Sequence, residues 1–84
     1  GICNGFQILT EAHLLPGAML RNRSLQFHCA WVDVRVEDSR CDWTREVEVG
    51  STLRLPVAHG EGAFFADEAT LDHLDERGQV VLRY

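Results

Sequence analysis

A cysteine lies between two glycines at the start of the chain, in the stretch GICNGFQ, and this setting suits a nucleophile. A thiol attacks a carbonyl carbon as its thiolate, which the positive end of a helix dipole and unpaired N–H groups favour. A sharp turn that exposes a nucleophile needs small residues beside it, and Gly1 and Gly5 flank Cys3 at that spacing. The N–H of Asn4 would then be free to face a developing oxyanion. The spacing alone also permits a cysteine packed at a helix start.

The pattern that follows Cys3 predicts a helix that would position the thiol. Apolar residues recur at helical spacing after Gly5, until the stretch LLPG at 14–17 ends the pattern. We therefore expect a helix over about residues 4–13, with Cys3 at its N-terminal edge. Gln7 lies one helical turn beyond Cys3 and shares its face. Alternatively, Gln7 is an ordinary residue of the helix surface.

Alternating apolar residues over 27–36 predict one long strand. The phase of the alternation changes between Trp31 and Val32, which we interpret as a bulge or a strong twist. Cys29 shares the first alternating face, and we expect it to be small filling of the core. The polar residues 37–45 indicate a loop.

A second strand is indicated by the alternation over 53–57. Pro56 cannot donate a ladder hydrogen bond, so this strand is expected at an edge or near a strand end. The glycine-punctuated stretch HGEG at 59–62 reads as a turn. His59 is either a turn residue without chemistry or part of a site.

The C-terminal third predicts a short helix followed by a strand. Asp67 is a suitable N-cap for a helix over about 68–76, and Gly78 stands where a left-handed residue commonly ends a helix. His73 is expected to be a solvated helix residue. The apolar residues of 80–84 indicate a strand.

Composition excludes several classes of function. The chain has 84 residues and a net charge of -5, which argues against binding of nucleic acid or an anionic membrane. Three cysteines cannot all pair, and their spacing is neither that of a disulfide framework nor that of a zinc site, so we expect a cytoplasmic protein without a bound metal. There is no phosphate-binding glycine motif and no lysine, so we expect no ATP site of the Walker type in this chain.

A longer string places the cysteine in a known context. GICNGFQ with ILTEAHLLPGAML resembles the nucleophile segment of class I (triad) glutamine amidotransferases, most closely the glutaminase subunits of phosphoribosylformylglycinamidine synthases of purine biosynthesis. The resemblance continues through RNRSLQFHCAWVDVRVE, LRLPVAHGEGAFFADEATL and QVVLRY, and so covers nearly the whole chain. It implies an α/β fold of three layers, flavodoxin-like, with a mainly parallel central sheet and with Cys3 at the carboxyl end of a strand.

The resemblance also implies roles for individual residues. Cys3 matches the nucleophile that attacks the side-chain amide of glutamine, releases ammonia and leaves a glutamyl thioester for water to hydrolyse. Asn4 matches the position whose N–H helps to form the oxyanion hole. The residues expected to complete the oxyanion and substrate site are Gly5, Gln7, His59, Gly60 and Glu61.

Partners and extent follow from the same resemblance. Ammonia would pass to a synthetase subunit or domain, possibly with a small bridging subunit, and ATP and Mg²⁺ would be used by that synthetase and not bound here. We expect residues 1–84 to be one partial domain, truncated at both ends and inactive alone, because the catalytic histidine and glutamate of the family lie in a later segment. A structural or docking fragment, and a cysteine hydrolase of the same fold with another substrate, are the alternatives.

Overall fold

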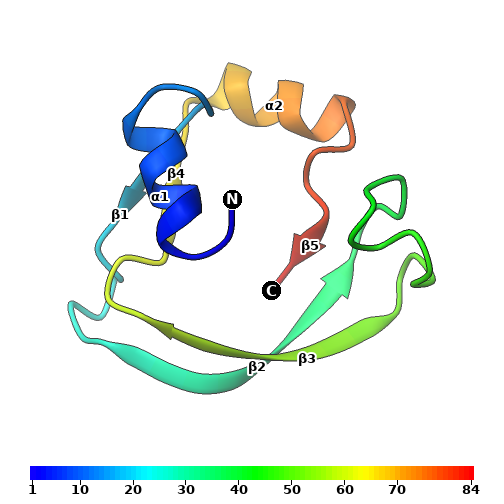
Figure 1. Ribbon diagram of the computed structural model, residues 1–84, viewed down its shortest axis with the longest axis horizontal. Helices are drawn as coiled ribbons and strands as arrows, with labels where there is room; N and C mark the ends of the chain where they lie inside the picture. The colour runs from blue at the N-terminus through cyan, green and yellow to red at the C-terminus, as the bar shows by residue number, and fades with distance from the viewer.

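Two paired strands are the most extended elements of the protein in the computed structural model, which describes all 84 residues (Figure 1). Strand β2 (His28–Val36) and strand β3 (Thr52–His59) pair antiparallel, with one residue opposite one throughout. Strand β5 (Leu82–Arg83) pairs antiparallel with the other side of β2, which gives the order β3-β2-β5. β3 is therefore an edge strand, as Pro56 predicted.

The two faces of β2 explain the change of phase in the sequence. Of the two interpretations, the bulge between Trp31 and Val32 is wrong, because the pairing with β3 runs through this point without an extra residue, and the strong twist stays a prediction. Val34 and Val36 lie on the inner face and are the buried hydrophobic residues of the chain. Cys29 lies on the opposite face with Trp31 and is exposed, so its prediction as core filling is also wrong. The phase changes because both faces carry apolar residues at this end of the strand.

A second, two-stranded sheet was not predicted. Strand β1 (Ala18–Leu20) pairs antiparallel with strand β4 (Ala63–Phe65), and three residues are too few to show an alternation. Helix α1 (Asn4–Glu11) packs against β1. The rings of Phe6 and Phe64, 6.1 Å apart between centroids, join α1 to β4. The helix that carries Cys3 is thus held against the strand that follows the HGEG loop.

Both predicted helices are present. α1 begins as expected but ends two residues early, because His13 adopts a left-handed conformation with φ 58°. Helix α2 (Glu68–Glu76) begins after Asp67, whose side chain accepts a hydrogen bond of 2.7 Å from the N–H of Thr70. Gly78 has φ 64°, as the C-terminal signal predicted.

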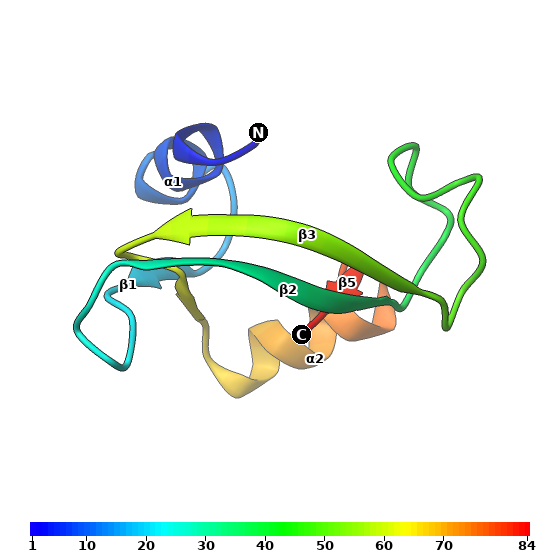
Figure 2. The same cartoon turned by 90° about the horizontal axis from the view of Figure 1, so that it is seen from below.

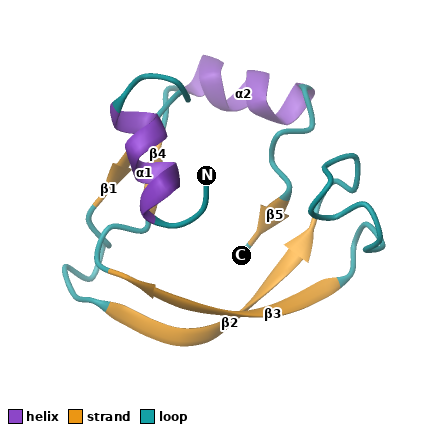
Figure 3. Ribbon diagram, viewed as in Figure 1, coloured by secondary structure: helices purple, strands orange, loops and turns teal.

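The α/β class is confirmed, whereas the expected mainly parallel central sheet is not formed by these residues. All three strand pairings are antiparallel. Parallel neighbours need a crossover, usually a helix, but β2 and β3 are joined by residues 37–51, which contain neither helix nor strand (Figure 3). Figure 2 shows α1 on one side of the β2–β3 pair and α2 on the other side. Neither helix has the length and apolar character needed to cross a membrane.

Candidate functional site

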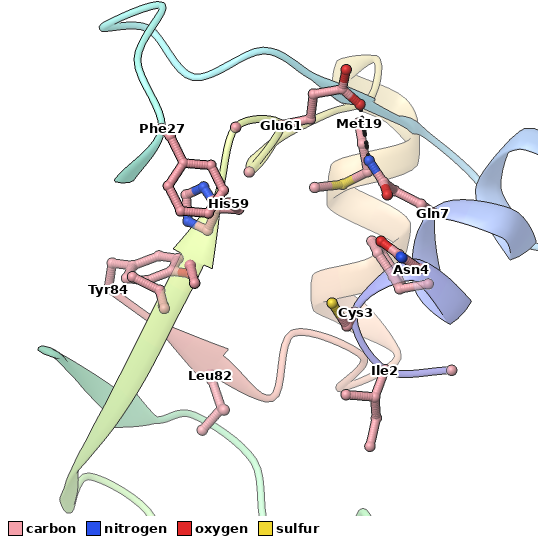
Figure 4. A pocket seen from close by; sticks show the side chains of 16 residues that line it. Ile2, Cys3, Asn4, Gln7, Met19, Phe27, His59, Glu61, Leu82 and Tyr84 are labelled. Carbon is pink, nitrogen blue, oxygen red and sulfur yellow. Dashed lines mark hydrogen bonds between the residues drawn. The ribbon is translucent and has the colours of Figure 1, made fainter. Parts of the chain in front are cut away.

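Cys3 occupies a sharp turn at the start of α1. Its backbone angles, φ 55° and ψ -124°, are those of the second residue in a type II′ turn, and the N–H of Gly5 closes that turn with a 2.9 Å bond to the carbonyl of Ile2. A positive φ is unfavourable for a residue with a side chain, and strained backbone of this kind is enriched at functional sites. The conformation leaves the side chain of Cys3 exposed, and Figure 4 shows the sulfur directed into a cleft.

The two glycines beside Cys3 differ in their need to be small. A Cβ added to Gly1 would lie 2.7 Å from the carbonyl carbon of Gly5 and 2.8 Å from the side chain of Leu9, so the backbone at residue 1 requires glycine. A Cβ added to Gly5 would meet no atom within 4 Å. The expectation that both glycines make room for the turn is therefore supported by contacts at Gly1 alone.

A cleft of about 890 Å³ lies between the first turn of α1 and the loop after β3 (Figure 4). Six of the seven predicted site residues line it, and Gly5 is the exception. The six are Cys3, Asn4, Gln7, His59, Gly60 and Glu61. The fold thus brings together residues more than 50 positions apart in the sequence.

A direct contact joins the two sides of the cleft. Nε2 of Gln7 donates a hydrogen bond of 2.9 Å to Oε2 of Glu61, which Figure 4 draws as a dashed line. Gln7 reaches this position because it lies one turn after Cys3 on α1, while Glu61 lies in the loop between β3 and β4. Glu61 is the one acidic side chain among the residues that line the cleft.

The N–H of Asn4 is available to a ligand. Asn4 is the first residue of α1, where the N–H groups have no intrahelical acceptor, and no other acceptor takes its N–H. The carbonyl of Cys3, by contrast, accepts from the N–H groups of Phe6 and Gln7 at 3.0 and 3.4 Å. A free N–H beside an exposed thiol can stabilise the oxyanion that forms when the thiol attacks a carbonyl carbon.

The other cysteines and the histidines form no hydrogen bond or disulfide with the thiol of Cys3. Cys29 is exposed on the outer face of the hairpin, and Cys41 lies in the segment between β2 and β3. His28 lies opposite His59 in the sheet, with ring centroids 6.0 Å apart. The thiol of Cys3 makes no hydrogen bond to any of the four histidines.

The groups with shifted pKa values lie outside the cleft. The side-chain hydrogen bond from Arg40 holds the pKa of Asp38 below its ordinary value, and the same pairing raises the pKa of Arg40. Hydrogen bonding from Thr70 lowers the pKa of Asp67 at the start of α2. These shifts belong to loop and helix-cap contacts.

Several residues in and behind the cleft were not predicted as site residues from the sequence. Phe27, Leu82 and Tyr84 line the cleft (Figure 4). Phe27 directly precedes β2, Leu82 lies in β5 and Tyr84 follows it. Asn22 lies behind the loop of residues 59–62 and forms hydrogen bonds to it. In the sequence, Asn22 is only one polar residue in the stretch RNRSLQF. Composition alone does not distinguish that stretch from an ordinary loop.

A protein family and several known proteins match this chain over its whole length. The family model described as a CobB/CobQ-like glutamine amidotransferase domain matches residues 1–84. The chain is 61% identical over 84 residues to the phosphoribosylformylglycinamidine synthase subunit PurQ of Thermomicrobium roseum, and 61% identical to that of Rubrobacter xylanophilus. These matches cover 100% of this chain, and they cover 36% and 38% of the two relatives. The chain therefore spans little more than a third of the length of these curated relatives.

A solved structure supports the same relationship. The chain aligns with a chain in the structure of PurLQS from Thermotoga maritima with a TM-score of 0.73 and 46% sequence identity. The alignment covers 77% of this chain and 31% of that chain. The arrangement of helices and strands described above is thus similar to one part of a larger known protein.

Proposed function

Because the chain belongs to the family of CobB/CobQ-like glutamine amidotransferase domains, we propose that it forms the nucleophile-bearing part of a glutaminase. The whole protein would be the subunit of phosphoribosylformylglycinamidine synthase that hydrolyses glutamine and supplies ammonia in purine biosynthesis. Identities of 55% to 61% over the whole chain to proteins of that name support this assignment. The observation that carries the proposal is the exposed thiol of Cys3, held in a strained turn at the wall of the cleft.

The proposed reaction begins at the thiol. The thiolate of Cys3 adds to the carbonyl carbon of the glutamine side-chain amide, and the N–H of Asn4 donates to the oxygen that becomes negative. Collapse of this intermediate expels the nitrogen, which leaves as ammonia after it gains a proton, and a glutamyl thioester remains. Water then hydrolyses the thioester to glutamate and restores the thiol. The free N–H of Asn4 supports this role.

Gln7, His59, Gly60 and Glu61 would hold the substrate in the cleft. The carboxylate of Glu61 is the group there that can bind the α-ammonium of glutamine, and Gln7 is already in contact with it at 2.9 Å. We include Gly5 only as a neighbour of the oxyanion position, since it does not line the cleft.

The rest of the activity would come from other parts of the assembly. We propose that a partner synthetase consumes the ammonia and binds the ATP and Mg²⁺ in a cytoplasmic complex, for which the similarity to a chain of PurLQS is the support. We also propose that the mainly parallel sheet, and the histidine and glutamate of the triad, belong to the parts of the family fold that lie outside these 84 residues. Tight coupling to the synthetase would keep the ammonia out of bulk water.

Replacement of Cys3 tests the function directly. In the intact protein assembled with its synthetase, Cys3→Ser should reduce glutamine-dependent synthesis roughly a thousand-fold or more, while ammonia-dependent synthesis stays near its original rate. The matched control is Cys29→Ser, because Cys29 is also an exposed thiol but lies on the outer face of the hairpin. Equal loss of both activities in Cys3→Ser, or full glutamine-dependent activity, would contradict the proposal.

A further inference from the structure

Asn22 is a buried amide that joins two segments of the chain, residues 22–26 and residues 59–62. Its relative exposure is 8%, and its Nδ2 donates to the carbonyls of Gln26 at 2.9 Å and of His59 at 2.8 Å. Its Oδ1 accepts from the N–H of Gly62 at 2.9 Å and lies 2.9 Å from Nδ1 of His59. The N–H of Asn22 also donates to the carbonyl of Gly60 at 2.9 Å. One side chain therefore determines the path of the loop over residues 59–62.

The neighbours of Asn22 determine which way its amide is turned. The carbonyl oxygens of Gln26 and His59 can only accept, so the atom that faces them must be the donor Nδ2. The backbone N–H of Gly62 can only donate, so the atom that faces it must be the oxygen Oδ1. The orientation of the amide is therefore fixed without reference to the imidazole.

This orientation determines the tautomer of His59. Oδ1 of Asn22 can only accept, so Nδ1 of His59 must carry the proton in their 2.9 Å hydrogen bond. In the neutral imidazole the other nitrogen, Nε2, is then unprotonated. Nε2 makes no hydrogen bond within the chain, and His59 lines the cleft. The ring thus presents an acceptor and not a donor.

Packing holds the ring in this position. A Cβ added to Gly62 would lie 2.2 Å from Cε1 and 2.3 Å from Nδ1 of His59, so the ring occupies the space that any other residue at 62 would need. Phe27 approaches Gly60 on the same side, at 3.8 Å from the position of a Cβ there. Figure 4 shows His59 beside Phe27 and Tyr84, across the cleft from Cys3.

We propose that Asn22 is a positioning residue for the cleft: it holds the loop of residues 59–62 and keeps His59 in the Nδ1–H tautomer. His59 then offers Nε2 as an acceptor to an N–H group of the substrate, and Glu61 is kept within reach of Gln7. The role of Asn22 in substrate binding rests on the proposed glutaminase function, whereas its control of the tautomer does not.

The first experiment measures the tautomer without any change to Asn22. The intact protein is labelled with ¹⁵N-histidine, and two-bond ¹H–¹⁵N correlation spectra are recorded at a pH where the imidazoles are neutral. The His59 signals are assigned by their loss in His59→Gln. The Nδ1–H pattern is the expected result for His59, and the Nε2–H pattern overturns the proposal.

The second experiment separates binding from chemistry. Asn22→Ala should raise the KM for glutamine about ten-fold or more and change kcat by less than about three-fold, because the loop contacts the bound substrate and not the reacting bond. Asn22→Asp keeps an oxygen for Gly62 and Nδ1 of His59 but has no donor for the carbonyls of Gln26 and His59, so it should recover the tautomer pattern and only part of the affinity. Arg23→Gln is the matched control, since Arg23 is the exposed neighbour of Asn22 and should leave both parameters unchanged.

The outcomes distinguish this inference from the function on which it rests. Co-elution of each variant with the synthetase reports whether it still folds and assembles, and the wild-type spectrum and Asn22→Asp decide the matter if Asn22→Ala does not fold. An unchanged KM and tautomer in a folded Asn22→Ala overturn the role of Asn22. Absence of glutamine hydrolysis in the wild type overturns the proposed function, while the spectrum still decides the tautomer.

Discussion

At the scale of single residues, the cleft depends on a strained backbone at Cys3. A residue with a side chain in this conformation is destabilising by about 1–3 kcal/mol, and a glycine would adopt it without strain. The strain places the thiol outward at the N-terminus of α1 and leaves the N–H of Asn4 free beside it. A cysteine retained at such a position is better explained by its chemistry than by its contribution to stability.

The two glycines beside this turn provide a matched test. In the intact protein, Gly1→Ala should lower stability by about 1–3 kcal/mol, because the new Cβ would overlap the backbone of Gly5. Gly5→Ala should be tolerated, and can raise stability by up to about 1 kcal/mol, because alanine favours a helix. Thermal unfolding and glutamine hydrolysis are measured for both variants. Equal tolerance of the two substitutions would show that the turn is not as tight as the distances at Gly1 indicate.

At the scale of elements, the predictions succeeded where one local signal determines the outcome. Helix α2 has an N-cap at Asp67 and a left-handed glycine at Gly78, and both its ends were predicted from those residues. Strand β3 was predicted from its alternation and placed at an edge by Pro56. These features depend on the backbone preferences of a few adjacent residues, which are visible in the sequence.

The failures concern elements whose form depends on distant residues. β1 and β4 exist because they pair across more than 40 positions, and neither shows a pattern alone. Alternation does not show which face of β2 the core will cover. The face of Cys29 was therefore assigned to the core, although the face of Val34 and Val36 is the buried one. Cys3 and Asn4 were indicated by their own sequence context, and Gln7, His59, Gly60 and Glu61 by the resemblance to a family. Asn22, by contrast, is recognised only by its contacts to the loop.

The cap of α2 should make this helix sensitive to acid. Hydrogen bonding from Thr70 lowers the pKa of Asp67 in the folded state below the value near 3.8 of the unfolded state. The ionised Asp67 therefore stabilises the folded state fully above the unfolded pKa, and this stabilisation is lost as the pH falls through the folded pKa. Hydrogen-exchange protection of the Thr70 amide should therefore fall between about pH 5 and about pH 2. Asp67→Asn keeps an acceptor but does not titrate, and should lose this part of the pH dependence. The same acid dependence in both proteins would assign the effect to other carboxyl groups.

At the scale of the whole molecule, these residues bury little of their apolar surface. Val34 and Val36 are the buried hydrophobic residues, while side chains as large as Trp31, Trp43 and Tyr84 are between 63% and 83% exposed. The accessible surface is 6783 Å², whereas a compact protein of this mass has about 5,000 Å². The excess is the surface that further protein would cover, and the relatives are nearly three times longer.

This excess leads to a prediction about residues 1–84 expressed alone. With so small a core, the conformational entropy lost on folding is not offset, so the isolated residues should unfold over a broad temperature range and bind a hydrophobic dye. They should also show no turnover of glutamine, since no histidine forms a hydrogen bond with the thiol of Cys3. The intact protein should unfold cooperatively and serves as the control in the same calorimeter.

A sharp transition of the isolated residues, with an enthalpy of about 60 kcal/mol, would contradict the prediction, because that value is typical of a complete domain of this length. Cleavage of glutamine by the isolated residues would in turn mean that a base for Cys3 lies among the four histidines present here.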